Sequence, residues 1–325
     1  MSAQEGGGGE GLRRAEQTLQ RELAAGLQAL QRRLLGQEEL VELALAAAIT
    51  GGHLLLEGPP GTGKTTLARS IAELLDAPSQ RIQLTSDLLP GDLIGVNIFD
   101  PATQRFQFHP GPLFTQVLIA DELNRAPPRT QSSLLEAMEE GQISLDGVRH
   151  ELERPFWVVA TQNPREQHGT WPLPESQLDR FLLCLSIGYA GKDAERQVLL
   201  RRGKTTTESL PRLSREQWLA CGEAIERVYV AEPLLEWTLS LVQRSRASSR
   251  GESISQGGEP FTPISTRGAL ALLEAARALA FLRGRDHVRP EELSALLKPA
   301  LAHRLLAPHA SQWLEEQLLQ APLPT

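Results

Sequence analysis

The stretch Gly58-Pro-Pro-Gly-Thr-Gly-Lys-Thr65 decides how this sequence folds, because its composition suits neither a helix nor a strand. It follows an apolar run at residues 53–57 and precedes an amphipathic helical pattern at residues 65–75. Its three glycines allow successive backbone N–H groups to turn inward onto a bound anion. A loop of this kind, between a strand and a helix, is typical of sites that bind nucleotide phosphates.

Two polar residues of the loop are expected to contact a bound nucleotide or its metal ion. We expect Lys64 to neutralise β- and γ-phosphate oxygens and the Thr65 hydroxyl to complete the shell of a Mg²⁺ ion. A glycine-rich turn without a ligand is the alternative, which the flanking strand and helix disfavour. The predicted nucleotide-binding residues of this stretch are Gly58, Pro59, Pro60, Gly61, Thr62, Gly63, Lys64, Thr65 and Thr66.

Around the loop, short apolar runs alternate with helical patterns as far as Ser186. Because the runs show little polar alternation, they predict a parallel sheet covered on both faces, an α/β fold. The predicted strands are 53–57, 81–84, 117–120, 156–162 and 181–186. Hairpins are predicted at 94–109 and 143–152, the second turning at Asp146-Gly147.

Past about residue 190 the pattern becomes helical, with a polar Ser/Gly loop expected at residues 245–260. The predicted helices are 214–229, 232–245, 266–283 and 290–304, and earlier helices are predicted from Leu12 to Leu34 and at 41–50. The expected domains are a disordered tail at 1–10, an α/β nucleotide-binding domain at 11–188 and a helical domain at 189–325.

Two acidic residues, Asp121 and Glu122, end the buried run at 117–120. Ligands of open α/β sheets bind at the carboxyl ends of the strands, so we expect Asp121 to hold Mg²⁺ and Glu122 to activate the attacking water. Asn163 follows the next run and would orient that water or contact the γ-phosphate. Acids at an exposed strand end, and an Asn-Pro turn that merely ends a strand, are the alternatives.

Two arginines are candidates for contacts with phosphate. Arg180 precedes the last predicted strand and could reach a nucleotide held by a neighbouring subunit. Its alternative role is an ion pair with Asp179 or Glu175. Arg267 lies in the first turn of a predicted helix, where the helix dipole disfavours a cation, although it could also be a solvated surface residue.

Composition excludes several classes of protein. The 325 residues carry a formal net charge of −7 and a pI of about 5.6, so the surface as a whole does not favour nucleic acid or anionic lipid. Cys184 and Cys221 match no metal-ligand spacing, which favours free thiols in a reducing compartment. The N-terminus has no apolar signal region, and the most apolar stretches are too short for a membrane span. A cytoplasmic protein without a membrane span is expected.

With these residues in view, residues 35–305 resemble the AAA+ ATPases, and within them the MoxR family. The resemblance rests on specific motifs beyond the loop at 58–65. They are LPGDLIG (89–95), FHPGPLF (108–114), ADELNRAPPRTQSSLLEAMEEGQISLDG (120–147), VVATQNPREQHGTWPLPESQLDRFLL (158–183), STRGALALLEAARALAFLRGRDHVRPEEL (265–293) and LAHRLL (301–306).

The resemblance implies a fold and a set of roles. The fold is a five-stranded αβα core with a helix-2 insert and a β-hairpin, followed by a small helical lid. Lys64 and Thr65 would take the Walker A role and Asp121 and Glu122 the Walker B role, with Gly36 and Gln37 lining the adenine pocket. Asn163 would be sensor 1, Arg180 a finger acting in trans and Arg267 a sensor 2 acting in cis. Thr-Arg-Gly at 266–268 departs slightly from the usual sensor 2 motif.

The resemblance also implies partners and work. Relatives usually assemble as ATP-dependent hexameric rings whose hairpins face a central pore, and the implied cofactors are ATP and Mg²⁺. They act like chaperones on protein clients, for example maturing metalloenzymes, often with a von Willebrand factor A domain partner.

Two other functions remain as alternatives. A nucleic-acid motor would need basic residues on its hairpins. The tip of the second predicted hairpin is instead Leu145-Asp146-Gly147, and the insert carries one basic residue, Arg105, with two acidic residues, Asp92 and Asp100. Contact with nucleic acid is therefore disfavoured. A scaffold that binds ATP without turnover would not need Glu122, Asn163 or Arg180.

Overall fold

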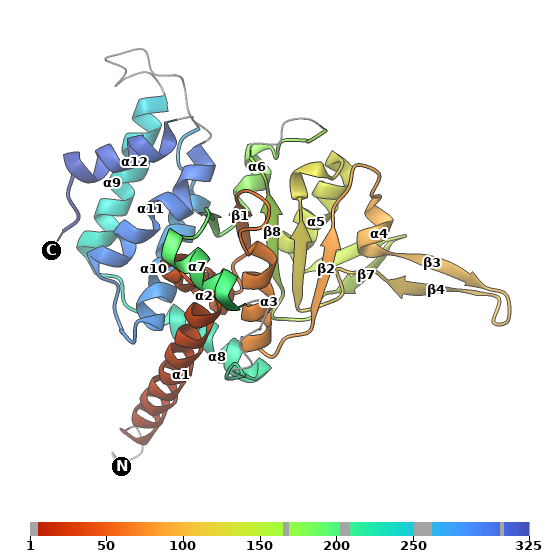
Figure 1. Ribbon diagram of the computed structural model, residues 1–325, viewed down its shortest axis with the longest axis horizontal. Coiled ribbons are helices and arrows are strands. Elements are labelled where there is room, and N and C mark those ends of the chain that lie inside the picture. Colours follow the sequence, from red (N-terminus) through yellow and green to blue (C-terminus); the bar gives the residue numbers. More distant parts are fainter. Residues whose placement is uncertain (1–5, 165–168, 202–208, 250–261, 306–308, 325) are drawn as a thin grey trace.

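Five parallel strands form the central sheet of the computed structural model, which describes residues 6–164, 169–201, 209–249, 262–305 and 309–324 (Figure 1). Their order is β2-β5-β8-β1-β9, so β1 lies between β8 and β9. The strands are β1 (Leu54–Glu57), β2 (Ser79–Gln83), β5 (Val117–Asp121), β8 (Trp157–Gln162) and β9 (Leu183–Ser186). The predicted parallel α/β sheet is confirmed.

Helices cover both faces of this sheet. Successive strand side chains point to opposite faces, and those on both faces are apolar and buried. Leu54 and Leu56 belong to one core with helices α1 to α3, whereas Leu55 belongs to a second core with α4 and α5. The helices are α1 (Gly6–Arg33), α2 (Glu38–Thr50), α3 (Lys64–Leu74), α4 (Pro90–Ile94) and α5 (Pro128–Glu140), with a 3₁₀ turn at Leu123–Arg125.

Two antiparallel hairpins extend from the sheet domain. Strands β3 (Gly95–Asp100) and β4 (Arg105–Pro110) form a long arm that projects from the body of the molecule (Figure 1). Strands β6 (Gln142–Leu145) and β7 (Val148–Glu151) turn at Asp146 and Gly147, whose φ angles of 50° and 80° are those of a type I′ turn. Both predicted hairpins are confirmed.

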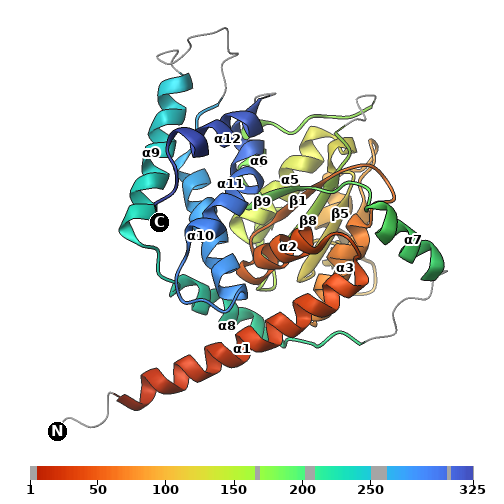
Figure 2. The same cartoon turned by 60° about the vertical axis from the view of Figure 1, so that its left-hand side comes forward.

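A mostly helical region follows the sheet and packs against α2, as Figure 2 shows. The apolar core of this region is continuous with the core beneath α1 to α3. The indole Nε1 of Trp218 donates to the Ala48 carbonyl at 2.8 Å. The elements of this region are α7 (Lys192–Arg201), α8 (Arg215–Glu226), α9 (Glu232–Ser249), α10 (Thr266–Leu282), α11 (Pro290–Leu305) and α12 (Ala310–Gln320), whereas the short helix α6 (Glu175–Leu178) precedes β9 of the sheet.

Two predicted segments differ from the structure at their ends. Helix α1 begins at Gly6, within the predicted disordered tail, while residues 1–5 lie outside the described residues. Helix α9 continues to Ser249, and the rest of the predicted 245–260 loop lies outside the described residues.

Candidate active site

The 58–65 loop links β1 to α3 and wraps around the start of that helix. Gly63, which precedes α3, has a φ of 93°, and a Cβ at Gly58 would lie 2.1 Å from the Ile187 carbonyl oxygen. Only glycine suits either position without a shift of the backbone. The loop lines a cavity of about 450 Å³ together with Arg81, Gln83, Asp121, Glu122 and residues 161–163. The structure therefore brings the loop and both acidic residues to one cavity.

Lys64 points back along its own loop. Its Nζ donates to the carbonyls of Gly58 at 2.8 Å and Pro59 at 2.7 Å. Burial lowers the pKa of Lys64, and the nearby carboxylates of Asp121 and Glu122 act in the opposite direction. The two carbonyl contacts hold the Lys64 amino group beside the loop, where it would attract phosphate oxygens.

Asp121 is the buried centre of the polar network. Its carboxylate accepts from Arg81 Nε at 2.6 Å, Thr161 Oγ1 at 3.2 Å and Thr65 Oγ1 at 3.3 Å. A hydroxyl and a carboxylate that face each other across a phosphate loop are hard oxygen ligands, of the kind that Mg²⁺ prefers. Thr65 and Asp121 therefore fit a magnesium site.

Glu122 has an unusual backbone that turns its side chain out of the strand. Its φ and ψ of 61° and 49° are left-handed, an uncommon conformation for a residue other than glycine. Its N–H donates to Thr161 Oγ1 at 3.1 Å, and its carboxylate pairs with Arg125 Nε at 3.1 Å. Glu122 thus lines the cavity beside Asp121 but points away from the buried network.

Asn163 lies where predicted, at the carboxyl end of β8 and on the lining of the same cavity. The neighbouring Gln162 amide donates to Glu57 Oε1 at 2.5 Å, and the Gln162 carbonyl accepts from Gly58 N–H at 3.2 Å. These bonds join the end of β8 to the start of the loop. One side-chain bond and one backbone bond thus set the position of Asn163 relative to the loop.

Gly36 and Gln37 approach the loop from the N-terminal helices. The Gln37 amide donates to the Gly188 carbonyl at 3.2 Å, and Leu34 lies next to Gly63. Gly36 has a φ of 74°, and a Cβ there would lie 2.9 Å from the Cβ of Ala194. This segment is adjacent to the phosphate loop, outside the residues that line the 450 Å³ cavity.

The two candidate arginines lie together, away from the loop. Arg180 and Arg267 both pair with Glu139, at 2.8 Å and 2.7 Å, and the hydrogen bond from Arg267 lowers the pKa of Glu139. Glu139 follows Met138, whose carbonyl oxygen lies 3.1 Å from His53 Nε2. His53 precedes β1, whereas the phosphate loop follows β1. The two arginines therefore lie at the edge of the sheet formed by the amino ends of the strands, opposite the loop.

This placement corrects one expectation. Arg267 does not lie at the phosphate loop of its own chain, as a sensor acting in cis would. The reason is that α10 begins beside the Arg180 segment, where the Ser265 hydroxyl at its N-cap lies 3.3 Å from the Asp179 carboxylate. The expected alternative for Arg180 also differs, because Arg180 pairs with Glu139, while Asp179 pairs with Arg304.

Sequence reasoning missed Arg81, Thr161 and Glu139. In the sheet Ala120 pairs with Ala160, so that Asp121 and Thr161 come next in register. Aligning the ends of the two predicted strands could have suggested Thr161. The partners of Glu139 come from distant segments, and no local pattern indicates them.

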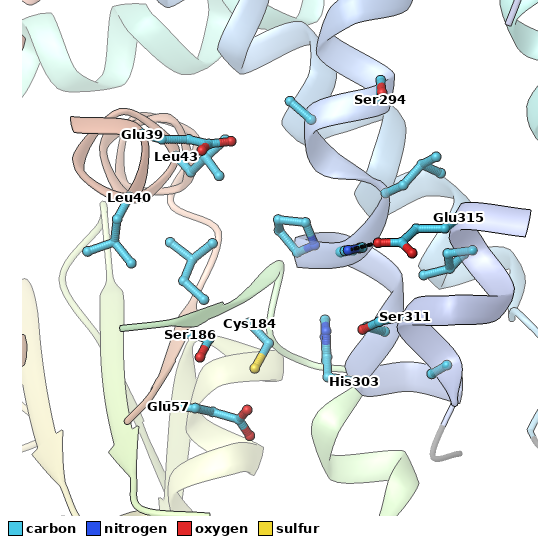
Figure 3. Close-up of a pocket in the computed structure, with 18 of the residues that line it drawn as sticks. Glu39, Leu40, Leu43, Glu57, Cys184, Ser186, Ser294, His303, Ser311 and Glu315 are labelled. Carbon is cyan, nitrogen blue, oxygen red and sulfur yellow. Dashed lines mark hydrogen bonds and ion pairs between the residues drawn. The ribbon is translucent and has the colours of Figure 1, made fainter. Parts of the chain in front are cut away.

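A larger cavity, of about 810 Å³, lies between β9 and helices α11 and α12 (Figure 3). Glu57, Cys184 and His303 face it, and burial raises the pKa of the Cys184 thiol. Cys184 is half-buried and Cys221 is buried, both as free thiols. Among the described residues, none of the predicted site residues lines this cavity.

Comparison with known proteins agrees with this geometry. The family model described as ATPase family associated with various cellular activities matches residues 53–183, and the AAA lid domain model matches residues 262–322. The chain is 37% identical to chaperone MoxR1 of Mycobacterium tuberculosis, over 92% of this chain and 78% of that protein. The chain belongs to the MoxR family of AAA ATPases.

Two further matches extend over most of this MoxR-family chain. The uncharacterized protein YeaC of Bacillus subtilis is 40% identical over 87% of each chain. The crystal structure of a candidate ATPase from Cytophaga hutchinsonii matches with a TM-score of 0.86 and 32% identity, over 97% of this chain and 99% of that one. The AAA core with a helical lid is thereby confirmed, and the chain is an ATPase. Among the helices that the structure describes, none has the length and apolarity to cross a membrane.

Proposed function

We propose that this MoxR-family ATPase uses ATP hydrolysis to remodel or mature protein clients, in a ring whose nucleotide sites are shared between subunits. The observation that carries the proposal is the apolar β3–β4 arm, which stands on the same domain as the phosphate loop. The ATPase would work with a von Willebrand factor A domain protein, as the family resemblance implies. It would act in the cytoplasm.

The cavity residues support distinct roles in hydrolysis. Lys64 and the loop N–H groups would bind the phosphates of ATP, and Thr65 and Asp121 would hold Mg²⁺, which screens charge on the phosphates when bound. Glu122 would accept a proton from the attacking water, and Asn163 would orient that water. Glu122 suits the role because its turned backbone keeps its carboxylate out of the buried network around Asp121.

The placement of the two arginines supports a shared site. Arg180 and Arg267 lie at the sheet edge opposite the loop, a position that disfavours contact with the phosphates of their own chain. In a head-to-tail ring each subunit presents one face to the opposite face of its neighbour. Both arginines would then reach the neighbouring nucleotide, and Arg267 becomes a residue acting in trans. The proposed number of subunits, six, follows the family resemblance.

The β3–β4 arm supports a protein client. Four apolar side chains of this two-stranded arm are exposed: Val96, Ile98, Phe99 and Phe106, at 48%, 49%, 49% and 70%. Such patches mark contacts with protein rather than with a polyanion. The second hairpin is joined to the arm, since the Asn97 amide donates to the Asp146 carboxylate at 2.7 Å. That carboxylate at the hairpin tip also disfavours nucleic acid.

The proposal is tested by capture with a Glu122→Gln variant, which should bind ATP but not hydrolyse it. We expect turnover to fall at least about 100-fold, the scale of a lost general base, with nucleotide affinity unchanged. A client should be retained with ATP and released with ADP. Hydrolysis at the wild-type rate would show that Glu122 is not the base.

The arm supplies a matched control for that capture. Adding Phe99→Ser and Phe106→Ser to the Glu122→Gln variant should abolish retention of the client and leave ATP binding intact. Recovery of a von Willebrand factor A domain protein or an immature metalloenzyme would support the proposal. Nuclease-sensitive nucleic acid without a protein client would instead favour a nucleic-acid motor.

A further inference from the structure

We propose that Arg304, on lid helix α11, is a positioning residue for Arg180, an inference that rests on the shared site proposed above. Arg304 is 4% exposed and lies outside the phosphate cavity, so the hydrolysis scheme gives it no task. Its guanidinium nevertheless contacts the backbone on both sides of Arg180. These contacts point to a role in holding that segment.

All five N–H donors of the Arg304 guanidinium have acceptors. Nε donates to the Asp179 carboxylate at 2.7 Å. Nη2 donates to the carbonyls of Phe181 at 2.7 Å and Asp179 at 3.2 Å. Nη1 donates to the Leu182 carbonyl at 3.3 Å and to the carbonyl of Ala300 in its own helix. A lysine has three donors on a single nitrogen and cannot make this planar set of bonds.

The bonds constrain Arg180 through its neighbours. The carbonyls of Asp179 and Phe181 belong to the residues before and after it, so the backbone of Arg180 is held while its side chain stays outside the network. That side chain is 25% exposed and pairs with Glu139, whose side chain is 40% exposed. An ion pair that solvent reaches is too weak to fix a long side chain by itself. The buried Arg304 network is therefore the stronger constraint on where Arg180 points.

The same network reaches the second arginine. The Asp179 carboxylate lies 3.3 Å from the hydroxyl of Ser265, which caps α10 by accepting from Gly268 N–H at 2.9 Å. A Cβ at Gly268 would lie 3.0 Å from Cδ of Arg304, so the start of α10 packs directly on the arginine. Arg267 lies within that first turn. Helices α10 and α11 and the Arg180 segment are thereby joined, and the lid sets the position of both arginines.

The first test is an Arg304→Lys variant, which keeps the charge and loses the planar set of donors. A displacement of about 1 Å at a reacting group can cost about 100-fold, so we expect kcat to fall by up to that factor. KM for ATP and the binding of a fluorescent ATP analogue should change less than about twofold, because the phosphate loop is at the other edge of the sheet. Asp179→Asn, which removes the charge that Arg304 Nε contacts, should show the same split between kcat and KM.

Arg283→Lys is the matched control. Arg283 also joins the lid to the sheet domain, through Glu42 of α2 at 2.8 Å and Glu292 of α11 at 3.1 Å, and it does not contact the Arg180 segment. We expect its kcat to remain within about twofold of the wild type. An equal loss of kcat in Arg283→Lys would assign the effect to general lid attachment and overturn the proposal.

Mixing subunits separates this proposal from the one on which it rests. Arg180→Ala subunits mixed with Glu122→Gln subunits should recover activity, since an interface between them combines an intact base with an intact arginine. If they do not, the shared site is wrong. Arg304→Lys subunits should be rescued by Glu122→Gln in the same way. Rescue of Arg180→Ala without rescue of Arg304→Lys, or loss of nucleotide binding in both Arg304→Lys and Asp179→Asn, would overturn the role of Arg304.

Discussion

At the scale of single residues, Thr161 holds both acidic residues of the site through one hydroxyl. Its Oγ1 donates to Asp121 Oδ1 at 3.2 Å and accepts from the N–H of Glu122 at 3.1 Å. Thr161 is 2% exposed, so a Thr161→Val change would leave these groups buried without that partner. We expect kcat to fall about tenfold and the unfolding free energy to fall by about 1–3 kcal/mol, measured by steady-state ATPase assay and urea denaturation.

Thr238→Val provides the control for this prediction. Thr238 is also 2% exposed, and its hydroxyl donates to the Leu234 carbonyl at 2.8 Å within α9, far from the cavity in the chain. The variant should lose a smaller amount of stability, about 1 kcal/mol, and keep its kcat. If both variants lowered kcat equally, Thr161 would act only through stability.

The residues that could be predicted from the sequence are those whose role depends on local pattern. Lys64, Thr65, Asp121, Glu122 and Asn163 each follow a recognisable strand or loop, and the structure brings all five to one cavity. Thr161 and Arg81 could not be predicted in this way, because they meet Asp121 only through the parallel register of β2, β5 and β8. Arg304 depends on a contact across more than a hundred residues of sequence, which no periodicity encodes.

At the scale of elements, His53 joins the start of β1 to β8 and α5. The Val158 N–H donates to His53 Nδ1 at 3.1 Å, and Nε2 lies 3.1 Å from the Met138 carbonyl, so the ring is neutral with its proton on Nε2. Burial lowers its pKa from 6.5 to about 4. In the unfolded chain the ring regains its ordinary pKa and binds a proton that the folded chain excludes.

The pH dependence of stability follows from this difference. Between pH 6.5 and pH 4 the unfolded state binds more protons, so the unfolding free energy falls as the pH falls through that window. For His53 the loss at pH 5 should be about 2 kcal/mol relative to pH 7.5. Urea denaturation at both pH values should show a smaller loss for His53→Gln, in which other groups still titrate. Equal losses in the variant and the wild type would contradict the burial of a neutral ring.

Elements whose pattern is local could be predicted, and those that depend on packing partners could not. The five strands, both hairpins and the start of α11 at Pro290 lie where predicted, with strand ends that differ by one or two residues, because apolar runs, Asp146-Gly147 and Pro290 act locally. The sequence also predicts where α10 begins, but it does not predict which edge of the sheet the first turn of α10 faces. That edge is set by the packing of α10 on α2 and of Ser265 beside Asp179, which are tertiary contacts.

At the scale of the whole molecule, the separation of the loop from Arg180 and Arg267 leads to the proposal that hydrolysis depends on assembly. In the proposed shared site, each chain would carry the base of one site and the arginines of the next, so an isolated chain would have no complete site. We expect the ATPase rate per subunit to rise with protein concentration through the range in which the ring assembles. Removal of an arginine finger costs about 10³–10⁵ in rate, which makes the residual activity of the isolated chain very small.

A dilution series checks this expectation, with the ATPase rate and the distribution of oligomers, by mass photometry, measured on the same samples. The rate per subunit should follow the fraction of assembled chains. Arg180→Ala separates assembly from catalysis: its rings should form and bind ATP yet remain as slow as the dilute wild type at every concentration. A wild-type rate per subunit that stayed constant where the chains are single would mean that each chain completes its own site. Arg180 and Arg267, at the far edge of the sheet, would then serve another purpose.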